Sequence, residues 1–263
     1  MKTSWGNVAG WYDKVVNDAD SYQSQVILPN VLRLMAPKRG DRVLDLACGQ
    51  GFCSHTLAAE GAHVTGVDIA PELIEIARTH AINDQEFIVS SADDLHEFKA
   101  GAFDSALCVL AVQNIEKMSA AFKEVARTLK SGGKFVIVLN HPAFRVPGQS
   151  SWGMDEKGAV SAGIRYRRVD EYLSESRATI DMHPGQVAAV AAGVARPVSR
   201  AVTYSFHRPL QVYSKTLANA GFAISRIEEW TSHKESEKGP HKQAEDKARR
   251  EIPLFMCLEC VKL

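Results

Sequence analysis

The sequence predicts an α/β fold in which a doubly wound, mostly parallel sheet carries helices on both faces. Short apolar stretches alternate with stretches of helical periodicity between residues 42 and 139, which is the pattern of repeated strand–helix units. This alternation breaks at residues 141–207 and then resumes. With 263 residues, 45% hydrophobic and 24% charged, the chain is long enough for one large domain with an insertion.

The first part of the chain is predicted to supply helices and three strands. Residues 6–36 carry apolar side chains near a 3.6-residue period, which predicts a helical region. Residues 42–47 are apolar almost throughout, as expected of a strand buried on both faces. The elements predicted next are a helix at Phe52–Glu60, a strand at His63–Ile69, a helix at 70–81 with Pro71 in its first turn, and a strand at 86–92.

The second part is predicted to complete the sheet around the insertion. Before the insertion we expect a strand at Ser105–Val112, a helix at Ser119–Leu129 ended by Gly132-Gly133, and a strand at Lys134–Leu139. Inside it, polar and aromatic stretches predict strands at 165–173 and 200–207, joined by an irregular, alanine-rich connection. After it come a helix at Leu210–Ala220, a strand at Ala223–Trp230, a solvated charged helix within 232–251, and a strand at Leu254–Val261.

Composition excludes several classes of partner. Lys plus Arg and Asp plus Glu both number 31, so no global field recruits nucleic acid or an anionic membrane. The sequence offers neither the apolar core of a signal peptide nor a stretch of about 18 apolar residues that would span a bilayer. Its five cysteines lack disulfide spacing. We therefore expect a cytoplasmic protein that binds neither nucleic acid nor membrane.

The loop after the first strand carries the first chemical signal. It reads Asp45-x-x-x-Gly49-x-Gly51, and Ser54 stands where a dinucleotide-binding fingerprint has its third glycine. An acid at this place would repel a pyrophosphate, but it suits a ligand that carries an ammonium and a sulfonium group. The two glycines let the backbone approach such a ligand, and the N-terminus of the following helix favours its carboxylate.

The ends of the next two strands agree with this ligand. Asp68 ends the second strand about 20 residues after Gly49, where an acid accepts hydrogen bonds from ribose hydroxyls. Ser91-Ala92-Asp93 ends the third strand, where the edge of an adenine would lie. An acid at the end of a buried strand is costly without a partner, which favours functional over merely structural roles for Asp45 and Asp68.

These motifs resemble the class I S-adenosylmethionine-dependent methyltransferases, and most closely the branch that acts on small molecules. The segments that carry the resemblance cover about residues 40–140 and read "VLDLACGQG", "VTGVDIAPELIEIAR", "SADDL", "FDSALCVLAVQNI" and "VARTLKSGGKFVI". The later segment "FHRPLQVYSKTLANAGFAI" also resembles that branch, which ends with a helix and an antiparallel strand pair. The resemblance implies a seven-stranded Rossmann-like methyltransferase sheet with an antiparallel last strand and an inserted lid.

The resemblance also implies which residues hold S-adenosylmethionine and release S-adenosylhomocysteine. Asp45, Gly49 and Gly51 would hold the methionine end, Asp68 the ribose, and the segments after the second and third strands the adenine. Two positions depart from the family pattern, since Ala47 replaces a glycine and Ser91 replaces an acid. The complete set expected at the cofactor is Tyr12, Asp45, Ala47, Gly49, Gly51, Asp68, Ile69, Ser91, Ala92, Asp93 and Leu110.

Four regions are expected on this basis. Residues 1–40 form N-terminal helices that cover the cofactor site, in which Tyr12 makes the contact and the nearby tryptophans pack. Residues 41–140 form the cofactor-binding core, residues 141–207 the substrate-covering insertion over the carboxyl ends of the strands, and residues 208–263 the C-terminal part of the core. The oligomeric state is left open.

Candidate catalytic and substrate residues follow the fourth and fifth strands. Asn114 and Gln113 stand where polar residues lie beside the transferred methyl group, with a strand-end cap as the alternative. His141 faces the same crevice and would accept a proton from a substrate, or else bond to backbone at the strand end. Arg145 would orient an anionic substrate, and His207 would bind substrate or act as a hinge or cap.

No metal site is expected. Cys257 and Cys260 have the spacing of a metal-binding pair, but side chains three apart on a strand point to opposite faces, and no second pair follows. The predicted function is methyl transfer to an oxygen, nitrogen or carbon atom of a small molecule. The alternatives are a nicotinamide-dependent oxidoreductase, which Asp45 and the missing third glycine oppose, and a catalytically silent cofactor-binding module.

Overall fold

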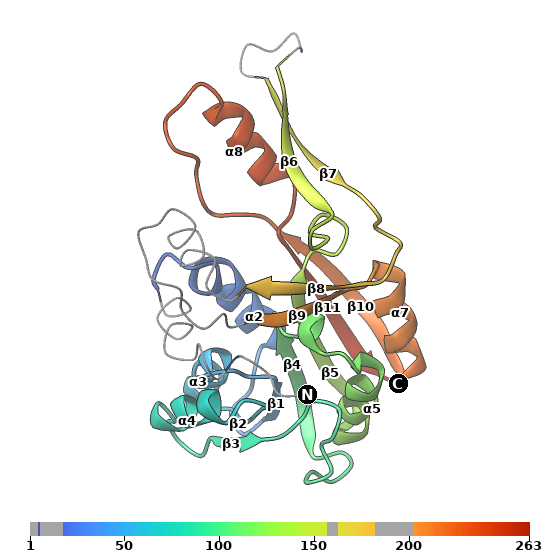
Figure 1. Ribbon diagram of the computed structural model, residues 1–263. Coiled ribbons are helices and arrows are strands. Elements are labelled where there is room, and N and C mark those ends of the chain that lie inside the picture. Colours follow the sequence, from blue (N-terminus) through green and yellow to red (C-terminus); the bar gives the residue numbers. More distant parts are fainter. Residues whose placement is uncertain (1–4, 6–17, 157–162, 182–201) are drawn as a thin grey trace.

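The computed structural model describes residue 5 and residues 18–156, 163–181 and 202–263. Its centre is a seven-stranded sheet in the order β10-β11-β5-β4-β1-β2-β3. Neighbours from β5 to β3 pair in parallel, whereas β11 pairs antiparallel with both β5 and β10. Helices cover both faces of the sheet (Figure 1). The predicted α/β fold with an antiparallel last strand is confirmed.

The first part of the chain follows the prediction closely up to β3. Of the helical region predicted at 6–36, residues 6–17 lie outside the described residues, and the described remainder contains the short π-helix η2 (Gln23–Ile27), which continues into α2 (Leu28–Met35). The following elements are β1 (Arg42–Leu46), α3 (Phe52–Ala59), β2 (His63–Asp68), α4 (Pro71–Thr79) and β3 (Glu86–Val89). Tyr12 lies outside the described residues, so the contact expected of it stays a prediction.

The remaining elements of the core differ from the prediction at the boundaries of two strands, since the strand predicted at Ser105–Val112 runs from Phe103 to Val109 and the start of β5 also differs. They are β4 (Phe103–Val109), the short helix η3 (Val112–Asn114), α5 (Met118–Thr128), β5 (Leu129–Asn140), α7 (Leu210–Asn219), β10 (Phe222–Trp230) and β11 (Phe255–Lys262). The expectation that Gly132-Gly133 precedes β5 was wrong, because β5 begins at Leu129 and contains both glycines. Gly132 has φ +74°, a conformation that glycine adopts without strain, and the pairing of β4 with β5 shifts register here.

Two antiparallel ribbons form within residues 141–207. The first pairs β6 (Ser150–Asp155) with β7 (Ile164–Val169), and the second pairs β8 (Ser176–Asp181) with β9 (Val202–His207). The sequence predicted β7 and β9 but missed their partners. In Figure 1 the β8–β9 ribbon lies across the molecule above β4 and β5, while the β6–β7 ribbon projects away from the sheet.

The charged segment 232–251 is helical only in its second half. Helix α8 spans Lys242–Glu251 and contacts β7. It is not fully solvated as expected, because Ala244 and Ala248 are buried. The preceding residues include Gly239-Pro240, a pair that interrupts helices.

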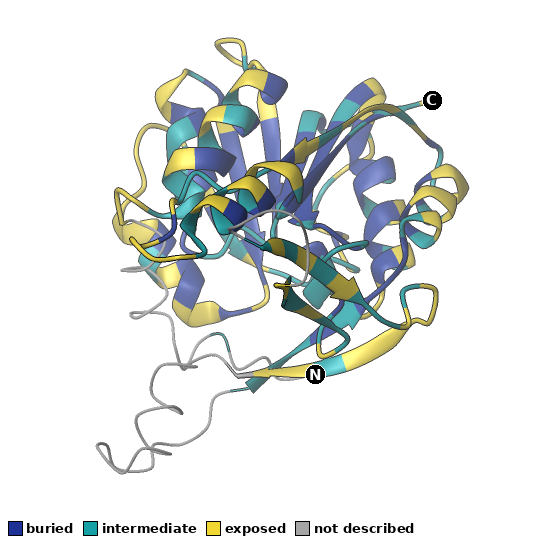
Figure 2. Cartoon of the chain, turned by 90° about the horizontal axis from the view of Figure 1, so that it is seen from above, coloured by how far each residue is buried: buried dark blue, intermediate teal, exposed yellow. Residues whose placement is uncertain are grey.

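Two hydrophobic clusters lie on the two faces of the sheet, between buried strands and helices with exposed outer surfaces (Figure 2). One cluster contains Leu44 of β1 with residues of α5 and α7, and the other contains Val43 with residues of α2 and α3. Cys260 belongs to the first cluster and Cys257 to the second. Burial raises the pKa of both thiols to about 12, so they act here as small apolar side chains.

Candidate active site

A cavity of about 630 Å³ opens at the carboxyl ends of β1, β2, β3 and β4. This is the edge at which open α/β sheets bind ligands, and the volume is within the range of small-molecule sites. The β8–β9 ribbon contributes its far wall. Ten of the residues predicted from the sequence line it together, namely Asp45, Ala47, Gly49, Asp68, Ile69, Ser91, Ala92, Asp93, Leu110 and Asn114.

Asp45 brings a buried carboxyl to the floor of this cavity. It is the fourth residue of β1 and is only 2% exposed. Its Oδ2 accepts a hydrogen bond from Ser54 Oγ at 2.6 Å. Burial raises its pKa to about 7, and the nearby charge of Asp68 adds to the shift. The site therefore disfavours the carboxylate until a cation arrives.

The loop after β1 passes through three left-handed residues. Ala47 has φ +56°, Gly49 +58° and Gly51 +84°. A side chain at Gly51 would be strained at this φ, and its Cβ would lie 2.7 Å from His55 Nε2. Gly51 does not itself line the cavity; it caps the N-terminus of α3. The two glycines are explained by this backbone path, while Ala47 adopts the same conformation without being a glycine.

Asp68 is fixed at the end of β2 by backbone donors from both sides. Its Oδ2 accepts the Gly49 N–H at 3.0 Å, and its Oδ1 accepts the Ala70 N–H at 2.9 Å. Burial raises the pKa of this carboxyl. Since each carboxylate oxygen has two lone pairs, both can accept a further hydrogen bond from a ligand hydroxyl. The hydrogen bond from Gly49 connects Asp68 to the glycine loop.

Asp93 and its partners form the wall beyond β3. The Ser91 hydroxyl donates to Asp93 Oδ1, and Lys117 Nζ lies 3.0 Å from Asp93 Oδ2. The bond from Ser91 and the charge of Lys117 hold the pKa of Asp93 below its usual range. Ser91, Ala92 and Asp93 thus meet the cavity as predicted, but the Ser91 hydroxyl proton is already used within the protein.

Asn114 connects the core to the insertion. It ends η3, lines the cavity, and donates from Nδ2 to the backbone oxygen of Tyr204 on β9 at 2.8 Å. Gln113 lies outside the cavity, and its Nε2 donates to the Leu110 oxygen at 2.6 Å. This geometry favours the strand-end cap for Gln113 and a place beside the ligand for Asn114.

His141 is held away from the cavity. Its Nδ1 accepts the Ala143 N–H at 3.2 Å, so the neutral ring carries its proton on Nε2, which lies 2.6 Å from Glu229 Oε1. Burial lowers its pKa. Both nitrogens are therefore occupied, and the arrangement favours the alternative in which His141 caps the end of β5.

The two remaining predicted substrate residues also lie outside the cavity lining. His207 Nε2 bonds to the Tyr172 oxygen at 2.7 Å, which favours its role as a cap at the return from the insertion. Arg145 donates its backbone N–H to the His141 oxygen at 2.9 Å, in the turn that follows β5. The structure does not bring these residues to the predicted site.

The sequence did not identify the residues that close the cavity from the N-terminal side. Trp5 lines the cavity and packs against Ala70 and Leu73. Gln23 lines it from η2, and π-helical turns often occur at functional sites. Only the clustering of aromatic residues near the N-terminus indicated that this region faces the ligand.

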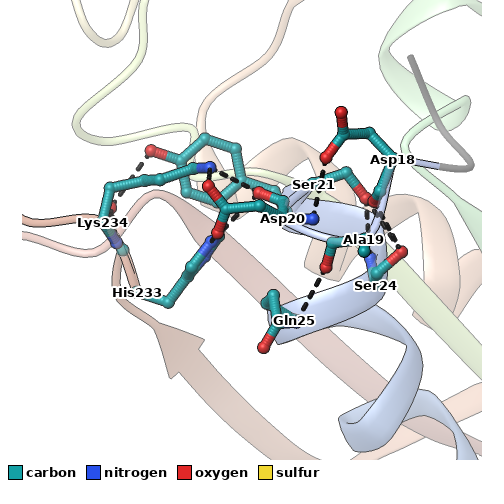
Figure 3. Close-up of polar contacts among 10 residues, drawn as sticks. Asp18, Ala19, Asp20, Ser21, Ser24, Gln25, His233 and Lys234 are labelled. Carbon is teal, nitrogen blue, oxygen red and sulfur yellow. Dashed lines mark hydrogen bonds and ion pairs between the residues drawn. The ribbon is translucent and has the colours of Figure 1, made fainter.

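An exposed polar cluster anchors the segment before η2 (Figure 3). Asp20 forms ion pairs with Lys234 and with His233, whose Nε2 lies 3.0 Å from Asp20 Oδ1. Tyr22 Oη and Ser232 Oγ lie 3.1 Å apart. These contacts hold the start of η2 against the loop that follows β10, and Gln23 comes directly after them.

The insertion supplies a second set of residues that the sequence missed. Arg177 of β8 and four residues of β9 line the cavity. The stretch "RAVTYSFH" predicted a strand, but no pattern in it could show which face would meet a ligand. The β9 residues are Val202, Thr203, Tyr204 and Phe206.

Two absences concern only the part of the chain that the structure describes. In this part of the chain, no three His, Cys, Asp or Glu side chains gather as metal ligands would. Within the same residues, no helix combines the length and apolar character needed to cross a bilayer.

Comparison with known proteins places the core among methyltransferases. A family model described as a methyltransferase domain matches residues 44–137. A ubiquinone biosynthesis O-methyltransferase of Xanthomonas oryzae is 36% identical over 132 residues, which are 47% of this chain and 55% of that enzyme. The chain therefore matches about half the length of this curated relative.

Solved structures extend the likeness across most of the chain. An S-adenosylmethionine-dependent methyltransferase from Mesorhizobium loti is 25% identical, with a TM-score of 0.65, and the match covers 89% of this chain and 96% of that one. The glycopeptide N-methyltransferase MtfA, solved with S-adenosylmethionine, shares the fold at 14% identity, with a TM-score of 0.56 over 90% of this chain and 93% of its own.

Proposed function

We propose that this chain, which belongs to the class I S-adenosylmethionine-dependent methyltransferases, transfers the methyl group of S-adenosylmethionine to a small-molecule acceptor. The observation that carries the proposal is a pair of buried carboxyls, Asp45 and Asp68, that face one cavity beside the glycine loop. Among the described residues neither has a basic partner. Such a site is completed by a ligand that carries positive charge and hydroxyl groups.

The residues around the cavity fit this cofactor in a definite order. Asp45 would face the ammonium and sulfonium end, and Gly49 would let the backbone approach it. Asp68 would accept hydrogen bonds from the ribose hydroxyls through the lone pairs that its backbone donors leave free. Ile69 and Ala92 would line the adenine, with Asp93 at its edge.

The cofactor would supply an activated methyl group to the acceptor atom, its sulfur would keep the electron pair of the broken carbon–sulfur bond, and the acceptor's proton would pass to bulk solvent. The protein's contribution is to align the two reactants and to exclude water. Asn114 would contact the acceptor, since its Nδ2 is held by Tyr204 while its Oδ1 remains available. We assign no proton-accepting role to His141.

The proposal also covers the kind of partner, the cellular compartment and the roles of the regions of the chain. Equal numbers of acidic and basic residues support a small molecule rather than a nucleic acid or a membrane as partner. The five cysteines are all free, which supports residence in a reducing compartment such as the cytoplasm. The proposed domain roles are those of a cofactor-binding core at 41–140 covered by residues 1–40 and by the insertion at 141–207.

Methyl transfer is tested with isotopically labelled S-adenosylmethionine and a panel of phenols, carboxylates, amines and quinones, followed by mass spectrometry. At least one class should acquire label in the presence of the protein. Calorimetry with S-adenosylhomocysteine tests the cofactor site independently of the acceptor. A protein that binds neither form of the cofactor would contradict the proposed function.

The Asp68→Ala variant tests the ribose assignment. It should weaken S-adenosylhomocysteine binding by about 1.5–3 kcal/mol, the scale of hydrogen bonds to a charged group. Asp94→Ala is the matched control, because Asp94 is a nearby carboxylate that pairs with His96 and does not line the cavity. Equal affinity of the Asp68 variant and the parent, measured by calorimetry, would rule out the assignment.

A further inference from the structure

One wall of the cavity is built by the β8–β9 ribbon, which contacts η3 and whose position across the sheet is visible in Figure 1. Its lining residues are Arg177 on β8 and Val202, Thr203, Tyr204 and Phe206 on β9. Asn114 ties this ribbon to the core through the Tyr204 oxygen. The wall is therefore mostly apolar and aromatic, with one guanidinium.

Arg177 is prepared to receive an anion. Its guanidinium carbon lies 3.9 Å from the centroid of the Tyr204 ring, so the ring covers one face of the group. A guanidinium stacked in this way keeps the N–H groups at its edge free for a planar, bidentate acceptor. No carboxylate of the described residues lies within ion-pair distance of Arg177.

The other charges of the cavity leave Arg177 as the group that selects an anion. Lys117, the second basic side chain of the lining, is neutralised by Asp93 at 3.0 Å. Glu116 and Arg177 are both exposed, and Glu116 lies beside Lys117 in the chain. Asp45 and Asp68 come from β1 and β2, whereas the β8–β9 ribbon contacts η3, which follows β4. The carboxyls expected at the cofactor and the guanidinium of Arg177 thus come from different walls of the cavity.

We propose that the acceptor is a small aromatic carboxylic acid, whose carboxylate is held bidentately by Arg177 and whose ring lies against Tyr204 and Phe206. This inference rests on the proposed function, because it assigns the second reactant of the same cavity. Because Arg177 and the two carboxyls come from different walls of the cavity, their opposite charges give the acid one orientation, with its carboxylate at β8 and its nucleophilic atom toward the cofactor. They also disfavour its binding in the cofactor's place.

The test compares matched acids and amides. Hydroxybenzoates and aminobenzoates are titrated into the complex with S-adenosylhomocysteine, beside the corresponding primary benzamides, which have the same shape and no charge. The parent should bind at least one acid about 10-fold or more tighter than its amide, as expected for a charge-assisted bidentate contact.

The variants test whether the preference for the acid depends on the charge of Arg177 or on that of another basic residue. Arg177→Gln should reduce the preference for the acid to about 2-fold or less while amide binding and S-adenosylhomocysteine binding stay unchanged, and Arg177→Lys should retain part of the preference. Arg165→Gln is the matched control, because Arg165 also stacks on an aromatic ring, that of Trp152, but lies outside the cavity lining. It should behave as the parent.

Three results would overturn the inference, and each differs from a failure of the proposed function. A parent that binds acids no better than amides has no anion-selecting site. A preference that persists in Arg177→Gln is set by another residue. An Arg177→Gln variant that binds S-adenosylhomocysteine 10-fold more weakly shows that Arg177 holds the carboxylate of the cofactor. By contrast, a parent that does not bind S-adenosylhomocysteine at all contradicts the proposed function itself.

Discussion

Asp45 shows how a single residue sets a cost that a ligand can remove. Its pKa of about 7 arises mainly from burial, so the folded protein binds the proton more tightly than the unfolded chain, where the carboxyl has its usual pKa of 3.8. Between these two values the folded state holds more protons, and the free energy of unfolding falls as the pH rises. Below pH 3.8 this residue imposes no penalty, and above pH 7 the penalty is complete.

Replacing this carboxyl should therefore stabilise the free protein at neutral and alkaline pH. Asp45→Asn keeps an acceptor for the Ser54 hydroxyl and removes the ionisation. We expect the free energy of unfolding of the variant, relative to the parent, to increase by about 2 kcal/mol between pH 5 and pH 8. Urea denaturation at both pH values measures the gap. A constant difference would show that Asp45 titrates alike in the folded and unfolded states.

The Asp45→Asn substitution should weaken the binding of S-adenosylmethionine although it stabilises the folded protein. In the parent, a cationic ligand lowers the pKa of Asp45, so binding of S-adenosylmethionine near pH 6 should release a proton and strengthen as the pH approaches 7. Calorimetry in buffers of different ionisation enthalpy detects this proton. The Asp45→Asn variant should bind more weakly and release none.

Ala47 is the position in the glycine loop where a glycine would have less backbone strain. A non-glycine residue with φ +56° costs about 1 kcal/mol relative to glycine in that conformation. Ala47→Gly also gains freedom in the unfolded chain, which offsets part of this difference. Thermal denaturation should show a change between zero and about 1 kcal/mol of added stability. A clear loss of stability would mean that the alanine methyl group packs usefully in the cavity wall.

At the scale of elements, Arg208 secures the insertion where it returns to the core. This buried side chain donates from one terminal nitrogen to the backbone oxygens of Ile115 at 2.8 Å and Glu116 at 2.9 Å. Its guanidinium also lies 5.1 Å from the ring of Phe206, on β9. A two-stranded ribbon such as β8–β9 is barely stable alone, so it depends on such attachments.

Loss of this attachment should loosen the ribbon without disturbing the central sheet. In Arg208→Met, the amides of β9 should exchange with solvent hydrogen about 10-fold faster or more, because each buried carbonyl loses a charged donor. The amides of β4 and β5 should keep their protection. Arg226→Met, on the exposed face of β10, is the control. Equal acceleration throughout the chain would instead indicate global destabilisation.

Burial on both faces made the central strands predictable from apolar runs, whereas β7 and β9 were predicted from polar and aromatic stretches. Continuous apolar runs predict β1 and β5. In β1, for example, Leu44 and Val43 pack into the clusters on opposite faces of the sheet. β6 and β8 have mostly exposed or half-buried side chains, so backbone pairing stabilises them and no hydrophobic period reveals them. The predicted start of β5 was wrong because a glycine pair can mark either a turn or a bulge. Only the pairing with a neighbouring strand decides between the two.

At the scale of the whole molecule, the candidate site joins segments that are far apart in the chain. Trp5 and Gln23 come from the N-terminal region, Asp45 and Asp68 from the core, and Tyr204 from the insertion. Motif spacing located the core residues because they lie next to one another at strand ends. It placed His141 in the same crevice because it cannot show that Glu229, distant in sequence, holds the ring elsewhere.

A shared cavity implies that the two reactants favour each other's binding. The residues proposed to meet the acceptor and those proposed to meet the cofactor line the same cavity. An aromatic acid should therefore bind about 10-fold or more tightly to the complex with S-adenosylhomocysteine than to the free protein, since the cofactor completes its surroundings. Paired calorimetric titrations measure the coupling. Equal affinities would mean that the two ligands bind independently.

The connectivity of the insertion has a consequence for how such a protein diversifies. The segment leaves the core after Asn140, at the end of β5, and returns through Arg208 just before α7, so no strand of the seven-stranded sheet changes place when its length or sequence changes. Mutations in this one stretch can change the wall that is proposed to meet the acceptor while the glycine loop and its two carboxyls remain unchanged. The fold thereby allows the residues of the core to be kept while those of the insertion vary. An exchange of residues 141–207 between relatives is then a direct way to transfer acceptor preference.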